Sequence, residues 1–542
     1  MRSSLLESLL LITYGTYCAY ASGPQVNLTT GLFEGVSSSK NGTDRWLGIP
    51  YSLPPIGSMR FKAPRAIAEF SEGIQTAYSF GNACSQPLTS ELTGTVNLGA
   101  PVSEDCLFLN VWRPENTSVD AGLPVLVWIH GGSYNTGTAS DPTYDGTGIV
   151  NRSVATGRPI IFVSINYRLN TFGFLASADM PVEDLNAGIQ DQRMALQFIQ
   201  DNISHFGGDP LKVTIWGQSA GAGSVETHIL YGDSSLFRGA IMNSATGPFK
   251  TAPPPSSYDQ PGKPYDLLLN ATSCEAGSSS VECLQQTLMN ITNTLMTDVL
   301  NGQLWEPTVA AGNFISVEPS EKIFAGDFLH IPVIMGTNLN DGSLFSIAVM
   351  NLGLSGSAQD AALDKFMLST IIDNSTVTSD VLLENNALYP ADDTSLGAPF
   401  NTGDSLFDRA SAWYGDAYFL APRRLFVEQA AGLQPVYAYS FQEQIPGNIE
   451  FLGVYHASEL PLLFGPIPAV ASVETEFAET WQDFYLDFVH DLNPGDAWPQ
   501  YTNESRHILQ LRRDNITAIP DDFNSASTDF QNLPEVLLEW QK

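Results

Sequence analysis

Basic residues are scarce in this sequence. Its 542 residues include 24 Lys and Arg against 58 Asp and Glu, which gives a formal net charge of -34. Such a charge repels nucleic acid phosphates and anionic membrane surfaces, so we expect neither as a partner. Long apolar runs are also missing, because no segment after the N-terminus approaches the ~20 apolar residues of a membrane helix. With 43% hydrophobic residues for a core, the composition predicts a soluble globular protein without a membrane span.

The first 21 residues differ from the rest of the chain. They contain Arg2, a mostly apolar stretch over residues 9–17 and a small-x-small site at Ala19-Tyr20-Ala21. This is the pattern of a secretory signal peptide. We therefore expect residues 1–21 to be removed and residues 22–542 to form one mature domain, since no repeat or biased linker divides it.

Cysteine is rare too, and of the five cysteines Cys18 would leave with the signal. The remaining four are an even number, as expected of disulfides in an oxidising compartment. Four cysteines permit three pairings; chain order favours Cys84 with Cys106 and Cys274 with Cys283, and four free thiols are the alternative. Glycosylation sequons point to the same secretory route, and they lie at Asn27, Asn41, Asn116, Asn151, Asn202, Asn270, Asn290, Asn374, Asn503 and Asn515. The sequence thus predicts a secreted, extracellular glycoprotein.

Short apolar runs alternate with turns and helical patterns along the chain. The runs that we expect to form strands occupy residues 125–129, 160–165, 213–216, 332–335 and 436–441. Between the second and third of them, apolar residues repeat at helical spacing within residues 190–206. This order predicts an α/β fold with a large, mostly parallel central sheet flanked by helices, as a single domain with insertions.

One segment, Gly217-Gln218-Ser219-Ala220-Gly221, has the G-x-S-x-G pattern and follows the third expected strand. Small residues around the serine allow a strained strand-to-helix turn that exposes the hydroxyl. The serine would then lie at a helix N-terminus, where free amides favour developing negative charge. We predict Ser219 as a nucleophile; an ordinary glycine-rich turn is the alternative.

A serine nucleophile needs a base, which comes last in the Ser, acid, His order of α/β-hydrolases. Three histidines come late enough, namely His456, His490 and His507. The last two lie in helix-like stretches, whereas His456 lies in a loop after the expected strand at 436–441. We therefore predict His456 as the general base, and we expect activity to be lost in acid because the base must be neutral.

The acid that orients the histidine should follow another strand. Asp341 comes after the expected strand at 332–335 and would accept the second imidazole N–H. Asp404 and Asp408 are rivals by chain order, but their polar loop or helix start favours a capping role. Since sites form where parallel strands end, the three loops can meet although they are far apart in sequence.

Backbone amides must also stabilise the oxyanion of an acyl transfer. One should come from Ala220, directly after the nucleophile, and others from the turn His130-Gly131-Gly132-Ser133 after the expected strand at 125–129. This chemistry requires no cofactor and no metal, and we expect neither.

Together these motifs resemble the type-B carboxylesterases and lipases, the cholinesterase-like branch of the α/β-hydrolases, and especially their fungal secreted members. The likeness covers nearly the whole mature chain and includes Gly48-Ile49-Pro50-Tyr51, Glu104-Asp105-Cys106-Leu107, Asn166-Tyr167-Arg168 and Phe206-Gly207-Gly208-Asp209-Pro210. The resemblance implies the triad Ser219, Asp341 and His456, and the two disulfides favoured above. It further implies oxyanion amides from Gly132, Ser133 and Ala220, with support from Ser224 behind the site; Gly131 and Glu459 are expected to support it as well.

The sequence departs from the family pattern at three points. Asn340-Asp341-Gly342 stands where Asp-Glu-Gly is usual, so the shorter acid must approach the imidazole more closely. Gly131-Gly132-Ser133 stands where Gly-Gly-Gly is usual, so the Ser133 side chain should narrow the pocket. Gln218 stands where glutamate is common, which removes a charge near the site.

The loop between the first two mature cysteines bears on the substrate. In lipases of the family this loop is a long amphipathic lid, but residues 85–105 here are polar at many positions and lack an apolar face. We therefore expect an esterase that acts through an acyl-serine intermediate on soluble, short-chain or aryl esters, with hydroxycinnamate esters as one candidate among the aryl esters. A lipase or sterol esterase for long-chain esters is the alternative, and a non-catalytic adhesion or binding protein is a remote one, since all three triad positions are occupied.

Overall fold

The computed structural model describes residues 23–38, 41–87, 89–90, 94–95, 97–245, 252–286 and 305–541. Its centre is a sheet in which parallel pairing runs without interruption from β12 to β17, and antiparallel strands close both edges. From one edge to the other, its strands are β18 (Thr517–Pro520), β17 (His507–Leu511), β16 (Val436–Phe441), β15 (Val333–Asn338), β14 (Gly239–Asn243), β13 (Gly208–Gln218), β11 (Leu123–Ile129), β12 (Ile161–Ile165), β10 (Phe108–Pro114), β4 (Thr43–Pro50) and β3 (Val36–Ser38).

Smaller sheets and helices surround this centre. The small sheets pair β1 (Gln25–Leu28) with β2 (Gly31–Glu34) and β5 (Ser71–Thr76), β6 (Ala83–Cys84) with β9 (Val102–Ser103), and β7 (Thr89–Ser90) with β8 (Gly94–Thr95). The α-helices are α1 (Thr147–Ala155), α2 (Asn170–Phe174), α3 (Ala187–Asn202), α4 (Ala220–Tyr231), α5 (Pro264–Thr272), α6 (Ser280–Gln285), α8 (Pro319–Ala325), α9 (Ser357–Leu368), α10 (Ser379–Leu388), α11 (Ser405–Gly415), α12 (Ala421–Ala430), α13 (Leu460–Phe464), α14 (Thr475–Asp491), α15 (Ser525–Gln531) and α16 (Pro534–Trp540).

The central strands are mostly apolar because helices cover both faces of the sheet. Along β11, Val125 and Val127 pack into a core shared with α3, α4 and α12, whereas Leu126 and Trp128 pack into a second core shared with α1, α13 and α14. Successive side chains of a strand point to opposite faces, so a strand covered on both sides buries side chains at every position, and most of these are apolar. The α/β architecture expected from the sequence is confirmed.

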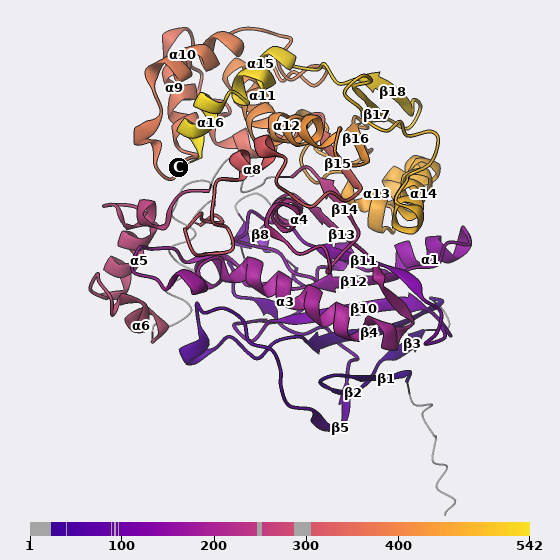
Figure 1. Cartoon of the computed structure of the whole chain (residues 1–542). Coiled ribbons are helices and arrows are strands. Elements are labelled where there is room, and N and C mark those ends of the chain that lie inside the picture. The colour runs from indigo at the N-terminus through magenta and orange to yellow at the C-terminus, as the bar shows by residue number, and fades with distance from the viewer. Residues whose placement is uncertain are drawn as a thin grey trace, which may run out of the picture.

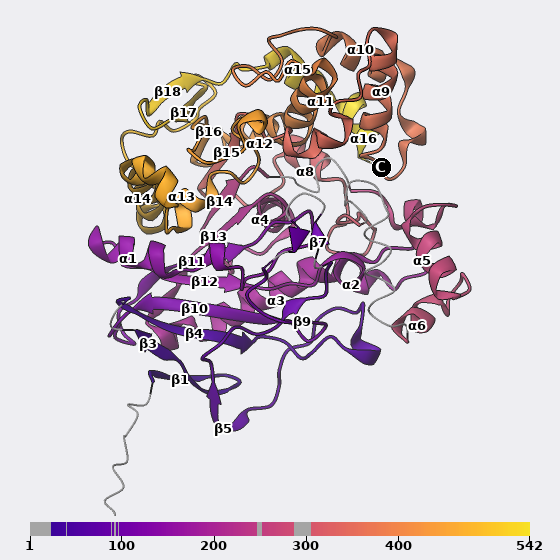
Figure 2. The ribbon, with the colours of Figure 1, turned by 180° about the vertical axis from the view of Figure 1, so that it is seen from behind.

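The ends of the molecule are built differently. Helices α9, α10, α11 and α16 gather at one end around a third core, and β1, β2 and β5 lie at the opposite end, as both views show (Figures 1 and 2). The first group follows β15 and stands beside the loop that carries Asp341. Among the helices of the described residues, none combines the length and apolar character needed to cross a membrane.

The expected elements agree with the structure at their centres more than at their bounds. β16 begins and ends where the sequence predicts, but β13 extends over eleven residues where only residues 213–216 were expected. The expected helix at 190–206 begins three residues earlier and ends in a 3-10 turn over Ile203–Phe206. The helix-like reading around His507 is wrong, because this residue begins β17 and pairs with Pro520 of β18, while later residues of β17 pair with β16.

Both expected disulfides are present, joining Cys84 to Cys106 and Cys274 to Cys283. Residues 1–21 and Asn290 lie outside the described residues, so the signal peptide and that sequon stay predictions. One sequon is unsuitable: Asn202 is 1% exposed, and its side chain accepts from the Thr29 amide and donates to Phe198 O, which leaves no room for a glycan. The exposed sequon asparagines are Asn27, Asn41, Asn116, Asn151, Asn270, Asn374, Asn503 and Asn515.

Candidate functional site

Ser219 lies at the turn between β13 and α4, with backbone angles of φ 58° and ψ -130°. Few non-glycine residues adopt a positive φ, and such strain is characteristic of a nucleophile held on a sharp turn. A Cβ on Gly217 would lie 2.3 Å from the Gly221 carbonyl oxygen, and one on Gly221 would lie 2.1 Å from that of Ile129. Both glycines of the motif are therefore required because the backbone packs closely around them, and not because they have a positive φ.

Side chains behind the turn form a hydrogen-bonded chain. Ser224 Oγ donates to the Ala220 carbonyl over 2.9 Å, and Gln192 Nε2 donates to Ser224 Oγ over 2.9 Å. His228 Nε2 lies 3.0 Å from Gln192 Oε1, and burial lowers the pKa of His228 to about 3, so its neutral ring donates there. Ser224 thus links the first turn of α4 to α3, and its supporting role stays a prediction.

Asp341 and His456, 115 residues apart, meet directly. His456 Nδ1 lies 2.9 Å from Asp341 Oδ1, in a contact where the carboxyl is 1% exposed. The second carboxylate oxygen accepts from Ser244 Oγ over 2.9 Å and from the Asn338 amide over 2.8 Å. Aspartate in place of glutamate thus reaches the imidazole without an intervening group. Because the carboxylate accepts, Nδ1 carries the proton and Nε2 keeps its lone pair.

Nε2 of His456 faces the nucleophile turn, but it contacts Gln218, the residue before the serine. His456 Nε2 lies 3.1 Å from Gln218 Nε2, whose amide N–H is the donor in this pair. Among the described residues, the Ser219 hydroxyl makes no hydrogen bond, so the structure brings the imidazole to the turn without closing the serine–histidine contact. In sites without substrate such contacts are often open and form in the reactive complex.

The His456 loop is attached to the Asp341 loop by two asparagines. Asn338 Nδ2 donates to Tyr455 O over 2.9 Å and to Glu459 Oε2 over 2.8 Å. Asn340 Oδ1 accepts from the Val454 backbone amide over 3.0 Å, while the backbone N–H of Asn340 donates to Val454 O. Burial raises the pKa of Glu459, which is fully covered beside the histidine. Glu459 therefore belongs to the hydrogen-bond network that joins the two loops, and its supporting role stays a prediction.

Two aromatic rings enclose the imidazole of His456. The centroid of Phe419 lies 4.6 Å and that of Phe345 5.2 Å from the imidazole centroid. They come from the segment after Asp341 and from the π-helical turn Asp416–Leu420. Sequence reasoning missed these rings, together with Ser244 and Asn338, because only a strand end or an apolar spacing marks them in the chain. It placed Gln218 near the site but did not predict its contact with His456.

The expected oxyanion turn packs against the nucleophile. A Cβ on Gly131 would lie 2.8 Å from the Ser219 Cβ, and the next residues, Gly132 and Ser133, have φ of 113° and 53°. No backbone bond of the described residues engages the amides of Gly132, Ser133 and Ala220. Free amides at such a turn are what a developing oxyanion requires.

His130 anchors the start of this turn. Its ring stacks on Tyr167 with centroids 4.5 Å apart, and the Tyr167 hydroxyl donates to the His130 carbonyl over 2.8 Å. Burial lowers the pKa of His130 to about 4, and its Nδ1–H is bonded to Gly131 O. The residue therefore stays neutral and shapes the backbone near the nucleophile.

The rival residues have other roles. Asp404 caps α11 by accepting from the Phe407 amide, and Asp408 accepts from Thr402. His490 lies in the last turn of α14, and His507 contacts Ser505 at the surface. In the part of the chain that is described, no group of three or more His, Cys, Asp and Glu side chains is placed to hold a metal ion.

A strained serine turn at the end of a central parallel strand, with the acid and histidine in loops that follow two later parallel strands, β15 and β16, defines the α/β-hydrolase class. Comparison with known proteins narrows this class. The sequence matches the carboxylesterase family over residues 22–531, and the chain belongs to this family.

Individual relatives cover almost the whole chain. "Secreted lipase 1" of Botryotinia fuckeliana is 31% identical over 95% of this chain and 94% of its own, and "Lipase 4" of Diutina rugosa is 31% identical over 98% of both chains. The crystal structure of Aspergillus niger EstA superimposes with a TM-score of 0.80 at 28% identity, covering 96% of this chain and 99% of its own. The protein is accordingly a carboxylic ester hydrolase.

Proposed function

We propose that Ser219, His456 and Asp341 form the catalytic triad of this hydrolase, acting through an acyl-serine intermediate. The observation that carries the proposal is the buried contact of His456 Nδ1 with Asp341, because it leaves Nε2 as a proton acceptor beside the nucleophile turn. The strained backbone of Ser219 supports the same assignment.

The chemistry follows from these positions. Ser219 Oγ displaces the Gln218 amide from His456 Nε2, gives its proton to that nitrogen and bonds to the ester carbonyl carbon. The amides of Gly132, Ser133 and Ala220 donate to the oxyanion. The alcohol then leaves with the proton from Nε2, and water, deprotonated by the same nitrogen, releases the acid and restores the serine.

For the substrate, we propose soluble, short-chain or aryl esters. The polar composition of residues 85–105 supports this class, since an interfacial lid needs an apolar face. Within this loop, residues 88, 91–93 and 96 lie outside the described part. Long-chain triglycerides are the second candidate, favoured by relatives whose names describe them as lipases.

The substrate proposal is tested by one assay in two forms. The rate on p-nitrophenyl butyrate is compared with the rate on emulsified triolein across its solubility limit. We expect the soluble ester to be preferred and no jump in rate when the emulsion forms. A sharp rise above the solubility limit would assign the protein to the lipases and leave the triad unaffected.

The nucleophile is tested by mass spectrometry after treatment with an organophosphonate. We expect one adduct per chain, on the peptide that contains Ser219, with simultaneous loss of activity. An unlabelled serine in an active preparation would overturn the triad, and an unlabelled serine in an inactive one would favour a binding protein.

We further propose that the protein is secreted and glycosylated. The relatives include a secreted lipase, and the exposed sequons together with two disulfides suit a secretory route. Expression of the full chain in a secreting host, followed by N-terminal sequencing and glycosidase treatment of the medium fraction, tests both parts: the N-terminus is expected at residue 22 and the mass is expected to fall.

A further inference from the structure

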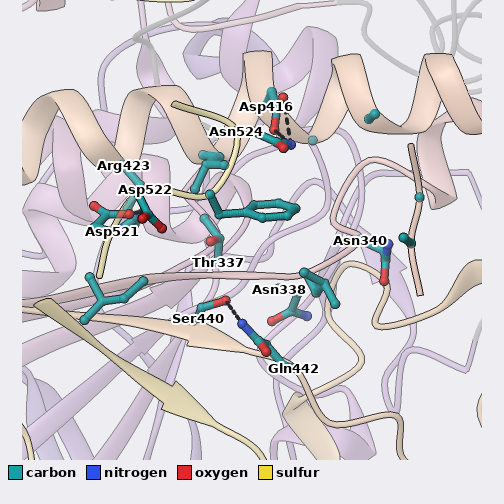
Figure 3. A pocket seen from close by; sticks show the side chains of 18 of the residues that line it. Thr337, Asn338, Asn340, Asp416, Arg423, Ser440, Gln442, Asp521, Asp522 and Asn524 are labelled. Carbon is teal, nitrogen blue, oxygen red and sulfur yellow. Dashed lines mark hydrogen bonds and ion pairs between the residues drawn. The ribbon is translucent and has the colours of Figure 1, made fainter. Parts of the chain in front are cut away.

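A cavity of about 310 Å³ lies behind the Asp341 loop (Figure 3). Its walls come from the ends of β15 and β16, from α11 and its π-helical continuation, and from the segment that follows β18. Ser219, Asp341 and His456 do not line it. Small-molecule sites begin at roughly 300 Å³, so this cavity has room for a compact ligand.

Polar groups of the cavity are mostly uncharged amides and hydroxyls. They belong to Thr337, Asn338, Asn340, Ser440, Gln442 and Asn524. Several lining residues also have buried polar atoms without a partner in the described structure: Nε and Nη1 of Arg423, Oδ1 of Asn338, Oγ of Ser411 and Oδ2 of Asp521. Those atoms are covered by protein, but the amides and hydroxyls that line the cavity include both donors and acceptors, and a ligand hydroxyl, which donates and accepts, can pair with either kind.

The charges of the cavity disfavour an ionic ligand. Arg423 donates to Asp521 over 2.6 Å; burial opposes ionisation of Asp521, but Arg423 and Arg424 lower its pKa to about 2. Asp416 and Asp522 add further carboxyls, and burial raises the pKa of Asp416 to about 6. A carboxylate ligand would be repelled by the three aspartates. An ammonium ligand would be repelled by the guanidinium of Arg423 and, having no acceptor, could not accept hydrogen bonds from the donors of the cavity.

Apolar side chains also form part of the lining of the cavity. Leu396, Ile508, Ile519, Pro520 and Phe523 contribute to it. We propose that the cavity is a second ligand site for a neutral, polyhydroxylated molecule with one apolar face, about the size of a small aryl glycoside. This site does not depend on the proposed triad.

A consequence for catalysis does depend on the triad. Asn338 and Asn340 line the cavity, and the same side chains hold the His456 loop through Tyr455 and Val454. A ligand that contacts these asparagines changes the free energy of the loop arrangement, and any such coupling between two sites is reciprocal. Occupancy of the cavity should therefore change the rate of ester hydrolysis.

Binding is tested by calorimetry on the full chain with phenyl β-D-glucoside, which has no ester bond and is not consumed. We expect one site per chain with a Kd of about 1 mM or tighter. Phenyl β-D-glucuronide, which adds a carboxylate, and cyclohexyl phenyl ether, which lacks hydroxyls, should each bind at least tenfold more weakly. Absence of glucoside binding, or equal binding of either analogue, would overturn the proposed ligand class.

Variants place the binding in this cavity. Gln442→Leu removes an amide whose hydrogen bond in the described structure goes to Ser440 and should weaken glucoside binding at least tenfold. Ser440→Leu, which fills the space, should do the same. Gln510→Leu is the matched control, a half-buried glutamine on neighbouring β17 that does not line the cavity. Unchanged binding in both cavity variants would place the glucoside elsewhere.

The coupling has its own readout. With saturating glucoside, kcat/KM for p-nitrophenyl butyrate should change severalfold in the native chain but not in Gln442→Leu. Binding without any change of rate would refute the coupling and leave the second site standing, while a failed triad shows itself separately in the phosphonate labelling.

Discussion

The nucleophile side and the acid–histidine side of the site are held by different physical means. Around Ser219 the backbone itself is packed, with three glycines at distances that exclude a Cβ. Around Asp341 and His456 the loops are joined by side-chain hydrogen bonds from Asn338, Asn340 and Ser244. The first arrangement is compact, and the second borders a cavity.

The difference shows where the site can tolerate change. A Cβ at Gly221 would lie 2.1 Å from a carbonyl oxygen and would force the backbone to move. The nucleophile turn is therefore tightly packed, and its glycines cannot be replaced without distorting it. Loops joined by hydrogen bonds can adjust, at a net cost of about 1 kcal/mol for each neutral bond that is lost. The base side is therefore the part that tunes the reaction, and the predictions below test this division.

The largest effect should come from the nucleophile. Ser219→Ala is expected to lower kcat by about 10⁵- to 10⁶-fold, because the attacking atom is removed, while the oxyanion amides retain some catalysis over water. Hydrolysis of p-nitrophenyl butyrate measures the loss, and thermal unfolding should remain near that of the native chain. Normal turnover in this variant would contradict the assignment.

Asp341→Asn should follow, with kcat lower by about 10⁴-fold. An amide donates where the carboxylate accepts, so the imidazole would turn to the wrong tautomer. Asp341→Glu serves as the control that keeps the charge, and it should retain more activity than the asparagine variant. Equal losses in both would indicate that geometry, not charge, sets the contribution of this residue.

Glu226, on the helix that follows the nucleophile, should make the stability of that side depend on pH. Burial raises the pKa of this carboxyl to about 8, and both oxygens lack partners in the described structure. The folded state therefore holds a proton that the unfolded state releases near pH 4.5, so stability falls as pH rises from about 4.5 to 8, by roughly 3 to 5 kcal/mol.

Glu226→Gln removes this titration. Urea unfolding should show equal stability of both proteins at pH 4, and a more stable variant at pH 8. Glu504→Gln, at an exposed carboxyl, is the matched control and should show no such divergence. If the stability of the native protein and of Glu226→Gln changed in parallel with pH, the carboxyl of Glu226 would be hydrogen-bonded to a protein group or to water in the folded state.

The smallest effect is expected from Gln218. In Gln218→Glu a carboxylate replaces the amide beside His456 Nε2 and stabilises the protonated imidazole. The acid limb of the kcat/KM profile should move to higher pH by about one unit, with little loss at alkaline pH. Gln218→Met, uncharged and of similar length, should leave the limb within a few tenths of its native position.

Much of this site could be predicted from local patterns. The motif around Ser219, the strand before it and the helix after it are all encoded within a few residues, because a strand-to-helix turn without room for a Cβ needs glycine at set positions. Asp341 and His456 could be predicted as the acid and the base because each follows an apolar strand. The helical reading of His507 failed because β17, which lies beside the edge strand β18, mixes buried and partly exposed positions without strict alternation.

The sequence by itself determined the fold class, the order of strands and helices along the chain and the residues able to carry the chemistry. The spacing of apolar residues and the residues that form turns are local properties of the chain. Only the tertiary structure decided that Gln218 occupies the histidine nitrogen, that Ser244 and Asn338 serve the acid, and that a cavity adjoins the same loop. Those contacts join segments about a hundred or more residues apart in most cases, and their geometry exists only once the sheet has brought the strand ends together.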